Sequence, residues 1–283
     1  MTIRAVIIYL AITEGLLPAK VFGQIMETED ASPLHPAQFH IETSVALQLD
    51  KDQKEITWPF GFEYGISKRL MVLAEPVVLT SINPDSGATS TGIGDLEVNV
   101  FFQLLSEKKV LPSLCLAGEV KIPTAQNEDI GTGKFDYSCF LIANKTTGKF
   151  FTTMNLGYTF LGKHVNGLSL GFFECGVSST FEVSPKGIFF GEVYGNTSAV
   201  DIDDLPVESL PIKTILENSE FAGGEIVFGA GYAYHLQNGL LLSFSANYSN
   251  SNELLLRAGI EWESGKNKLK TAFKNLKKKI KEK

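Results

Sequence analysis

From residue 39 onward the chain alternates apolar residues with polar or small ones. In the segment 39–49 the apolar residues take the odd positions, and in the segment 56–66 they take the even positions. A β-strand with this period of two has one apolar face and one polar face. The pattern predicts twelve strands and no helix before the C-terminal tail. The predicted strands are 39–49, 56–66, 70–80, 96–104, 114–122, 135–143, 150–160, 168–181, 188–195, 226–236, 240–248 and 254–262.

The connections between these strands alternate in length. Every second connection is short (67–69, 106–110, 146–149, 182–187 and 237–239), and the other set includes the long ones at 81–92, 123–133 and 196–223. Transmembrane β-barrels have tight periplasmic turns and longer outer loops. We therefore predict an all-β, antiparallel transmembrane β-barrel of about twelve strands. Because the strand number is even, both of its termini are expected on the periplasmic side of a Gram-negative-type outer membrane.

A soluble β-sandwich or soluble barrel would show the same alternation. Two features favour the membrane. Several predicted strands reach eleven residues, which is long for a soluble protein and suits a tilted crossing. Aromatic residues such as Trp58, Tyr158 and Trp262 lie towards strand ends, as in interfacial girdles.

Composition excludes several other classes. A mean hydropathy of +0.07 does not support a polytopic helical membrane protein. With three Cys, four His and no CxxC motif, the chain gives no sign of a zinc site, and neither metal nor cofactor is expected. The net charge of −7 combines a tail of nine Lys and one Glu, net +8, with an acidic body. No nucleic-acid partner is predicted, because the body is acidic and the location is wrong for the basic tail.

The chain divides into four predicted segments. Residues 1–23 have a basic start, an apolar run and small residues before Gln24, as a cleaved signal peptide does. The alternative is a buried strand or helix that begins a cytosolic domain. Residues 24–37 are polar, contain Pro33 and Pro36, and are predicted to form a linker. The barrel then occupies 38–263, and a Lys-rich tail occupies 264–283.

Several segments resemble the outer-membrane family labelled "meta-pathway of phenol degradation". The resemblance covers roughly residues 56–263. The matching segments are Gly92-Ile93-Gly94-Asp95-Leu96, Glu119-Val120-Lys121-Ile122-Pro123-Thr124, Gly131-Thr132-Gly133-Lys134-Phe135-Asp136-Tyr137, Asn155-Leu156-Gly157-Tyr158-Thr159-Phe160 and Glu192-Val193-Tyr194-Gly195. The resemblance implies an outer-membrane barrel of a family often described as transporters of hydrophobic or aromatic compounds. It implies no catalytic residues.

If the apolar positions face lipid, the alternate positions line the lumen. The predicted lumen-lining residues are Glu42, Glu63, Asp95, Glu97, Glu119, Lys121, Asp136, Glu225, Arg257 and Glu261. This acidic excess favours a narrow, cation-tolerant channel for small solutes. A plugged, structural or surface-interaction barrel that conducts nothing is the alternative.

An outer-membrane lipid hydrolase is a third possibility, and the sequence disfavours it. His40 and His235 lie on predicted strands, but neither has a local Ser/Asp arrangement. We therefore expect no enzyme activity. The thiols of Cys115, Cys139 and Cys175 are expected to be free and buried, because all three lie within strands.

The tail and the longest loop suggest interactions outside the barrel. Leu269, Phe273, Leu276 and Ile280 would share one face of a helix, with Lys277, Lys278 and Lys279 among the basic residues around it. Such a basic amphipathic helix can bind anionic phospholipid or an acidic periplasmic partner. The acidic loop 196–223 is expected to be solvated, with a mouth plug or a divalent-cation site as alternatives. The other expected partners are outer-membrane lipid and the barrel-assembly machinery.

Overall fold

The structure, a computed structural model, describes residues 26–165, 168–197, 224–236 and 239–264. These residues form thirteen strands: β1 (Phe39–Leu49), β2 (Gln53–Gly65), β3 (Leu70–Pro84), β4 (Ser90–Gly92), β5 (Leu96–Leu105), β6 (Ser113–Ile122), β7 (Asp136–Thr147), β8 (Phe150–Val165), β9 (Leu168–Glu182), β10 (Gly187–Asn196), β11 (Glu225–His235), β12 (Leu240–Ser249) and β13 (Leu254–Glu263). No described helix has the length and apolar character needed to cross a membrane.

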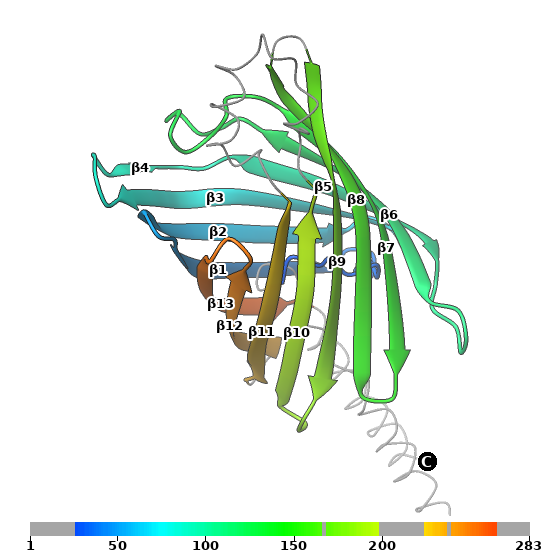
Figure 1. The fold of residues 1–283 in the computed structure, drawn as a ribbon. Helices are drawn as coiled ribbons and strands as arrows, with labels where there is room; N and C mark the ends of the chain where they lie inside the picture. Colours follow the sequence, from blue (N-terminus) through cyan, green and yellow to red (C-terminus); the bar gives the residue numbers. More distant parts are fainter. Residues whose placement is uncertain (1–25, 166–167, 198–223, 237–238, 265–283) are drawn as a thin grey trace, which may run out of the picture.

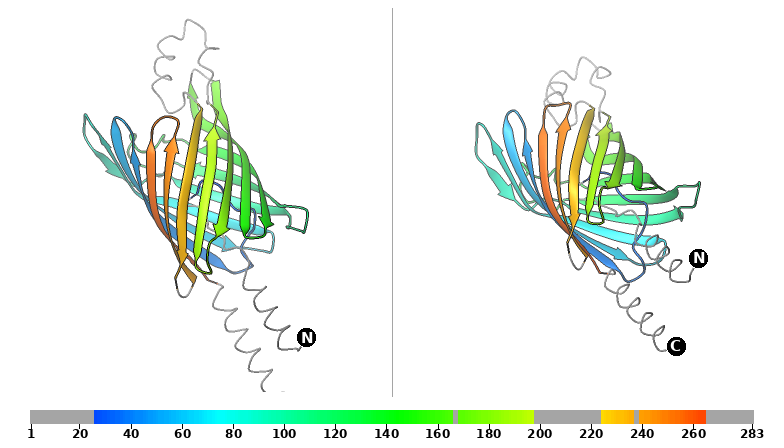
Figure 2. Two further views of the ribbon diagram at one scale, coloured as in Figure 1. Left: turned by 60° about the horizontal axis from the view of Figure 1, so that its bottom comes forward. Right: turned by 90° about the horizontal axis from the view of Figure 1, so that it is seen from below.

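The strands form one closed antiparallel barrel (Figures 1 and 2). The ring closes because β1 pairs with β2 on one side and with β13, the last strand, on the other. The short strand β4 and the strand β5 both pair with β3, along successive parts of its length. They therefore share one place in the ring, and the thirteen strands make a twelve-stranded barrel. The prediction of a twelve-stranded antiparallel barrel is therefore confirmed. The one strand that the sequence pattern missed, β4, lies inside the predicted 81–92 connection.

The two ends of the barrel differ. At the turn end, β1 begins beside the end of β13, where the backbone N–H of Ser264 donates to the carbonyl of Phe39 (2.9 Å). The short connections, including those between β7 and β8 and between β9 and β10, also lie at this end. At the opposite loop end, β3, β8 and β9 are 15 or 16 residues long and extend beyond the other strands.

The barrel faces are inverted relative to a soluble protein. On β1 the inward residues His40 and Glu42 are only 2% and 1% exposed, whereas the outward Val45 is 50% exposed. The same contrast runs around the ring, where outward Phe160, Phe228 and Phe244 are all more than half exposed. Such an apolar outer surface matches a hydrocarbon surrounding. The polar faces of the strands line the interior.

The turn-end half of the interior is packed. One apolar cluster contains Ala31, Leu34, Met71, Leu73, Phe101, Cys115, Ala117 and Ile142, and a second contains Met26, Ile188, Phe190, Ala233 and Leu241. Both clusters include residues that precede the first strand. The segment 26–37, which the sequence analysis interprets as part of a linker, therefore packs into the barrel through Met26, Ala31 and Leu34, and we call this segment the strap.

The cysteine prediction is right about redox state and partly wrong about location. All three thiols are free. Cys115 is buried in the interior, but Cys139 and Cys175 are exposed on the outer face. The reason is that membership of a strand does not bury a side chain, since successive residues point to opposite faces of the sheet.

Candidate functional site

The loop-end half of the interior is hollow. It contains a cavity of about 540 Å³ that the strap and most strands of the barrel line. Its acidic lining residues are Glu27, Glu29, Glu75, Glu97, Glu119, Glu174 and Glu225, and its basic residue is Arg257. Phe101, Phe140, Phe172 and Tyr194 line it as well. The cavity can therefore contact an aromatic solute, and its wall is rich in carboxyl groups.

The outer surface has an apolar groove next to this cavity. The groove encloses about 520 Å³ and is lined by outward residues such as Leu156, Phe173 and Ile226. Gly176 and Gly195 line both the groove and the cavity. Because glycine has no side chain, the wall between the two spaces is thin at these positions.

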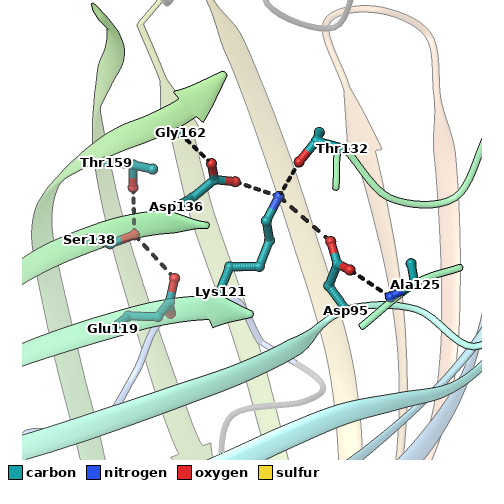
Figure 3. Close-up of polar contacts among 9 residues, drawn as sticks. All are labelled: Asp95, Glu119, Lys121, Ala125, Thr132, Asp136, Ser138, Thr159 and Gly162. Atoms are coloured by element: carbon teal, nitrogen blue, oxygen red, sulfur yellow. Dashed lines mark hydrogen bonds and ion pairs between the residues drawn. The ribbon is translucent and has the colours of Figure 1, made fainter. Parts of the chain in front are cut away.

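Three motif residues at the loop ends of neighbouring strands meet in a group that we call the latch (Asp95, Lys121 and Asp136; Figure 3). The Lys121 ammonium pairs with the Asp136 carboxylate, lies 3.7 Å from Asp95 Oδ2 and donates to Thr132 Oγ1 (3.1 Å). Backbone N–H groups satisfy the other carboxylate oxygens: Ala125 donates to Asp95 (3.0 Å) and Gly162 to Asp136 (2.8 Å). The latch thus joins β5, β6, β7 and β8 through satisfied charges.

Glu119 lies next to the latch and has partners of its own. Thr159 Oγ1 donates to Ser138 Oγ (2.8 Å), and Ser138 Oγ donates to Glu119 Oε1 (3.1 Å), as Figure 3 shows. This hydroxyl chain links β8, β7 and β6 across the inner wall. It holds one oxygen of Glu119, and the residue still lines the cavity.

The strap is fastened to strands on several sides of the barrel. Its polar contacts are Glu27 N–H to Glu192 Oε2 (2.9 Å), Thr28 Oγ1 to Ser178 Oγ (2.6 Å), the Glu27–Arg257 ion pair, the hydrogen bond from Asn144 Nδ2 to Asp30 Oδ1, and Ala37 N–H to the Gly65 carbonyl (2.8 Å). A Cβ at Gly65 would lie 2.3 Å from the His35 carbonyl oxygen. Glycine is therefore required where the strap meets β2.

The strap also adds a carboxyl group to the acidic interior. Removal from water inside the barrel raises the pKa of Glu29 well above its ordinary value, and the neighbouring carboxylates of Glu75 and Glu63 raise it further. A carboxyl group in these surroundings favours its neutral form. Proton uptake by Glu29 therefore stabilises the strap inside the barrel.

A second group of charged residues lies at the turn end, where the first and last strands meet. We call it the seam cluster: His40 and Glu42 on β1, Glu63 on β2 and Glu261 on β13. His40 Nδ1 lies 3.5 Å from Glu63 Oε1, and His40 Nε2 lies 3.8 Å from Glu261 Oε2. All four side chains are at most 4% exposed. Both ring nitrogens of His40 thus face carboxylates, whereas a catalytic-triad histidine faces a carboxylate with one nitrogen and the nucleophile with the other.

The structure divides the ten predicted lumen-lining residues into three groups. Glu42, Glu63 and Glu261 belong to the seam cluster, Asp95, Lys121 and Asp136 form the latch, and Glu97, Glu119, Glu225 and Arg257 line the cavity. Glu75, Glu174 and Glu192 were missed by the sequence analysis. All three lie on strands in which apolar and polar residues alternate less regularly. Assigning the inward-facing positions of these strands would have identified them. The tail residues Leu269, Phe273, Leu276, Ile280 and Lys277–Lys279, and loop residues 198–223, lie outside the described residues.

Comparison with known proteins supports these observations. A family model described as "Putative MetA-pathway of phenol degradation" matches residues 35–255. No curated protein matches the chain. An outer membrane channel from Pseudomonas putida F1 is similar in structure, with a TM-score of 0.63 and 9% sequence identity over 83% of this chain and 98% of that one. KdgM porin in complex with disordered oligogalacturonate has a TM-score of 0.52 and 8% identity over 79% of this chain and 98% of that one. At such low identity these likenesses establish the fold.

Proposed function

The chain belongs to the family whose model is described by the MetA pathway of phenol degradation, and on that premise we propose that it is an outer-membrane channel for small aromatic or other hydrophobic solutes. The single observation that best supports this function is the cavity of about 540 Å³ inside a closed barrel. That volume lies in the range of small-molecule sites. Its aromatic residues provide contact area for a ring, and its carboxylates favour neutral or cationic solutes over anions.

The location of the barrel follows from the same proposal. The apolar outer face would contact outer-membrane lipid after insertion by the barrel-assembly machinery, with the turn end and both termini in the periplasm. Fractionation of a cell envelope and heat-modifiable gel migration of the extracted protein test this placement. Recovery as a detergent-free soluble protein would refute it.

The basic tail adds a separate proposal. We expect residues 264–283 to bind anionic phospholipid or an acidic periplasmic partner. Deletion of residues 264–283 should reduce binding of the purified protein to phosphatidylglycerol vesicles. Unchanged binding would contradict a surface role for the tail.

The solute class can be tested with three probes that share one ring and differ in charge. Calorimetric titration of the purified protein should give tighter binding for benzylammonium and benzyl alcohol than for benzoate. Glu119→Lys places a cation in the cavity wall and should reverse the preference between benzylammonium and benzoate. Glu107→Gln, in the turn between β5 and β6, is the matched control and should leave it unchanged. Equal binding of all three probes by both variants would exclude the cavity as the selective site.

A plugged barrel is the second candidate, because the strap packs across the turn-end half of the interior. The two candidates differ in what the parent protein, with its strap in place, conducts and binds. For a channel, deletion of residues 26–34 should raise single-channel conductance in a planar bilayer several-fold, and the parent protein should already pass small cations. A parent protein that conducts nothing and binds none of the three probes would favour the plugged barrel.

A further inference from the structure

The seam cluster has more buried carboxylates than its basic group can neutralise. Both oxygens of Glu42 and one oxygen of Glu63 are buried and have no hydrogen-bond partner. The charged groups whose fields act on Glu42 are the carboxylates of Glu63, Glu261, Glu75 and Glu29. Burial of unpartnered carboxylate oxygens is unfavourable unless a cation approaches them or they take up a proton.

The barrel register brings these groups together. Glu63 is directly opposite His40 across the β1–β2 pair, and Glu261 is directly opposite Glu42 across the β1–β13 pair. On the other side of Glu42 the partner residue is Gly61, which has no side chain. The unpartnered Glu42 carboxylate therefore lies between Glu261 and a residue without a side chain, at the position where the barrel closes.

The donor atoms are close enough to share one ion. One ligand atom each from His40, Glu42 and Glu63 lies within 4.8 Å of the other two. Two ligand atoms on one Zn²⁺ can be at most about 4.2 Å apart, since each bond is about 2.1 Å long. The 3.5 Å separation of His40 Nδ1 and Glu63 Oε1 already fits this limit. Rotation of the broad terminal torsion of Glu42 is sufficient to bring its oxygen within reach.

We propose that the seam cluster is a binding site for one divalent transition-metal ion of the zinc type. Glu42, Glu63 and His40 Nδ1 are the ligands, and Glu261, whose Oε2 lies 3.8 Å from His40 Nε2, is the carboxylate that orients the ring. One imidazole and two carboxylates suit Zn²⁺ and similar borderline ions. Ca²⁺ and Mg²⁺ favour sites in which every ligand atom is oxygen. The ion links β1 to β2 directly, and the contact between His40 and Glu261 extends this link to β13.

This role is independent of transport. The sequence gives no zinc motif because the ligands come from the first two strands, with the orienting carboxylate from the last, so they do not form a short spacing pattern. An ion at this position would stabilise the folded barrel beside the closure between β1 and β13, since binding to the folded state alone increases stability.

The test uses the full chain, purified in detergent, stripped with a chelator and then mixed with ZnCl₂. Bound metal is measured by elemental analysis after desalting, and unfolding is followed by heat-modifiable gel migration. We expect one equivalent of Zn²⁺ per chain and an upward shift of several degrees in the unfolding temperature. MgCl₂ and CaCl₂ should produce neither effect.

Variants separate this site from adventitious binding. Glu42→Gln should weaken Zn²⁺ binding at least tenfold and abolish the zinc-dependent shift. Glu192→Gln, which removes a buried carboxylate on β10, is the matched control and should retain both. His40→Gln provides a second variant if Glu42→Gln does not fold, and Co²⁺ absorption bands that disappear in His40→Gln would identify the imidazole ligand. Equal Zn²⁺ binding by the parent protein and both seam variants, or no binding by the parent protein, would overturn the proposal.

Discussion

The latch and the seam cluster lie at opposite ends of the barrel. They differ in how far their carboxylates are neutralised and hydrogen-bonded. In the latch, Lys121 neutralises two aspartates, and backbone N–H groups satisfy the remaining carboxylate oxygens. In the seam cluster, His40 faces Glu63 and Glu261, and the Glu42 carboxylate has no hydrogen-bond partner. The latch is thus complete as a structural element, whereas the seam cluster has the acidic excess expected of a cation site.

The largest expected effect comes from breaking the latch. Lys121→Met removes the cation and leaves Asp95 and Asp136 without it in a partly buried position. We expect a loss of about 3 kcal/mol in the free energy of unfolding, because removal of one partner of a buried pair leaves an uncompensated charge. Urea unfolding followed by tryptophan fluorescence measures this change. Asp136→Asn should cost less, since Asp95 remains to pair with Lys121, and an equal loss would contradict the shared pairing.

The equivalent change in the seam cluster should have the opposite sign. Without metal, Glu42→Gln replaces an unpartnered carboxylate by a neutral amide of similar shape. We expect a gain of up to about 1 kcal/mol in chelator-treated protein, since the buried charge no longer has to be desolvated. The same urea measurement applies. A loss comparable to that of Lys121→Met would show that Glu42 is paired in the metal-free protein.

The strap adds the Glu29 carboxyl group to the acidic interior, and this group makes the stability of the folded protein depend on pH. Because the pKa of Glu29 is raised in the folded protein, the folded state binds more protons than the unfolded state. This contribution to stability is therefore greatest below the ordinary pKa of about 4.3 and is lost as pH rises through the folded pKa. Glu29→Gln should flatten this part of the dependence of unfolding temperature on pH and stabilise the protein at neutral pH. An unchanged pH profile would contradict the argument.

The smallest effect is expected at Glu107, which has a satisfied charge at the turn end. Burial alone would raise its pKa, but hydrogen bonds from the Thr146 backbone and hydroxyl groups and from Lys145 lower it below the ordinary value. The contribution of Glu107 is therefore present above pH about 4.3 and is lost as pH falls. Glu107→Gln should cost less than about 1 kcal/mol, since the group is near the surface. The pH dependence should run opposite to that of Glu29→Gln in the same melting assay.

The alternation of apolar and polar residues along the chain determines where the strands lie and which face of each strand is apolar. Alternation with period two is visible along each strand, so the twelve barrel strands and their lipid and lumen faces were predictable from residues such as Val45 and Glu42. The ten lumen-lining residues were predicted by the same rule. The short strand β4 was not predictable, because three residues contain too little periodicity.

Only the tertiary structure decided which inward residues meet. The strap is polar in sequence, yet Ala31 and Leu34 pack into an interior core that exists only after the barrel forms around them. The seam cluster depends on closure between β1 and β13, and the latch depends on the pairing that brings the loop ends of β5, β6 and β7 together. The physical reason is that strand periodicity is a local property, whereas register and closure are set by pairing between distant segments.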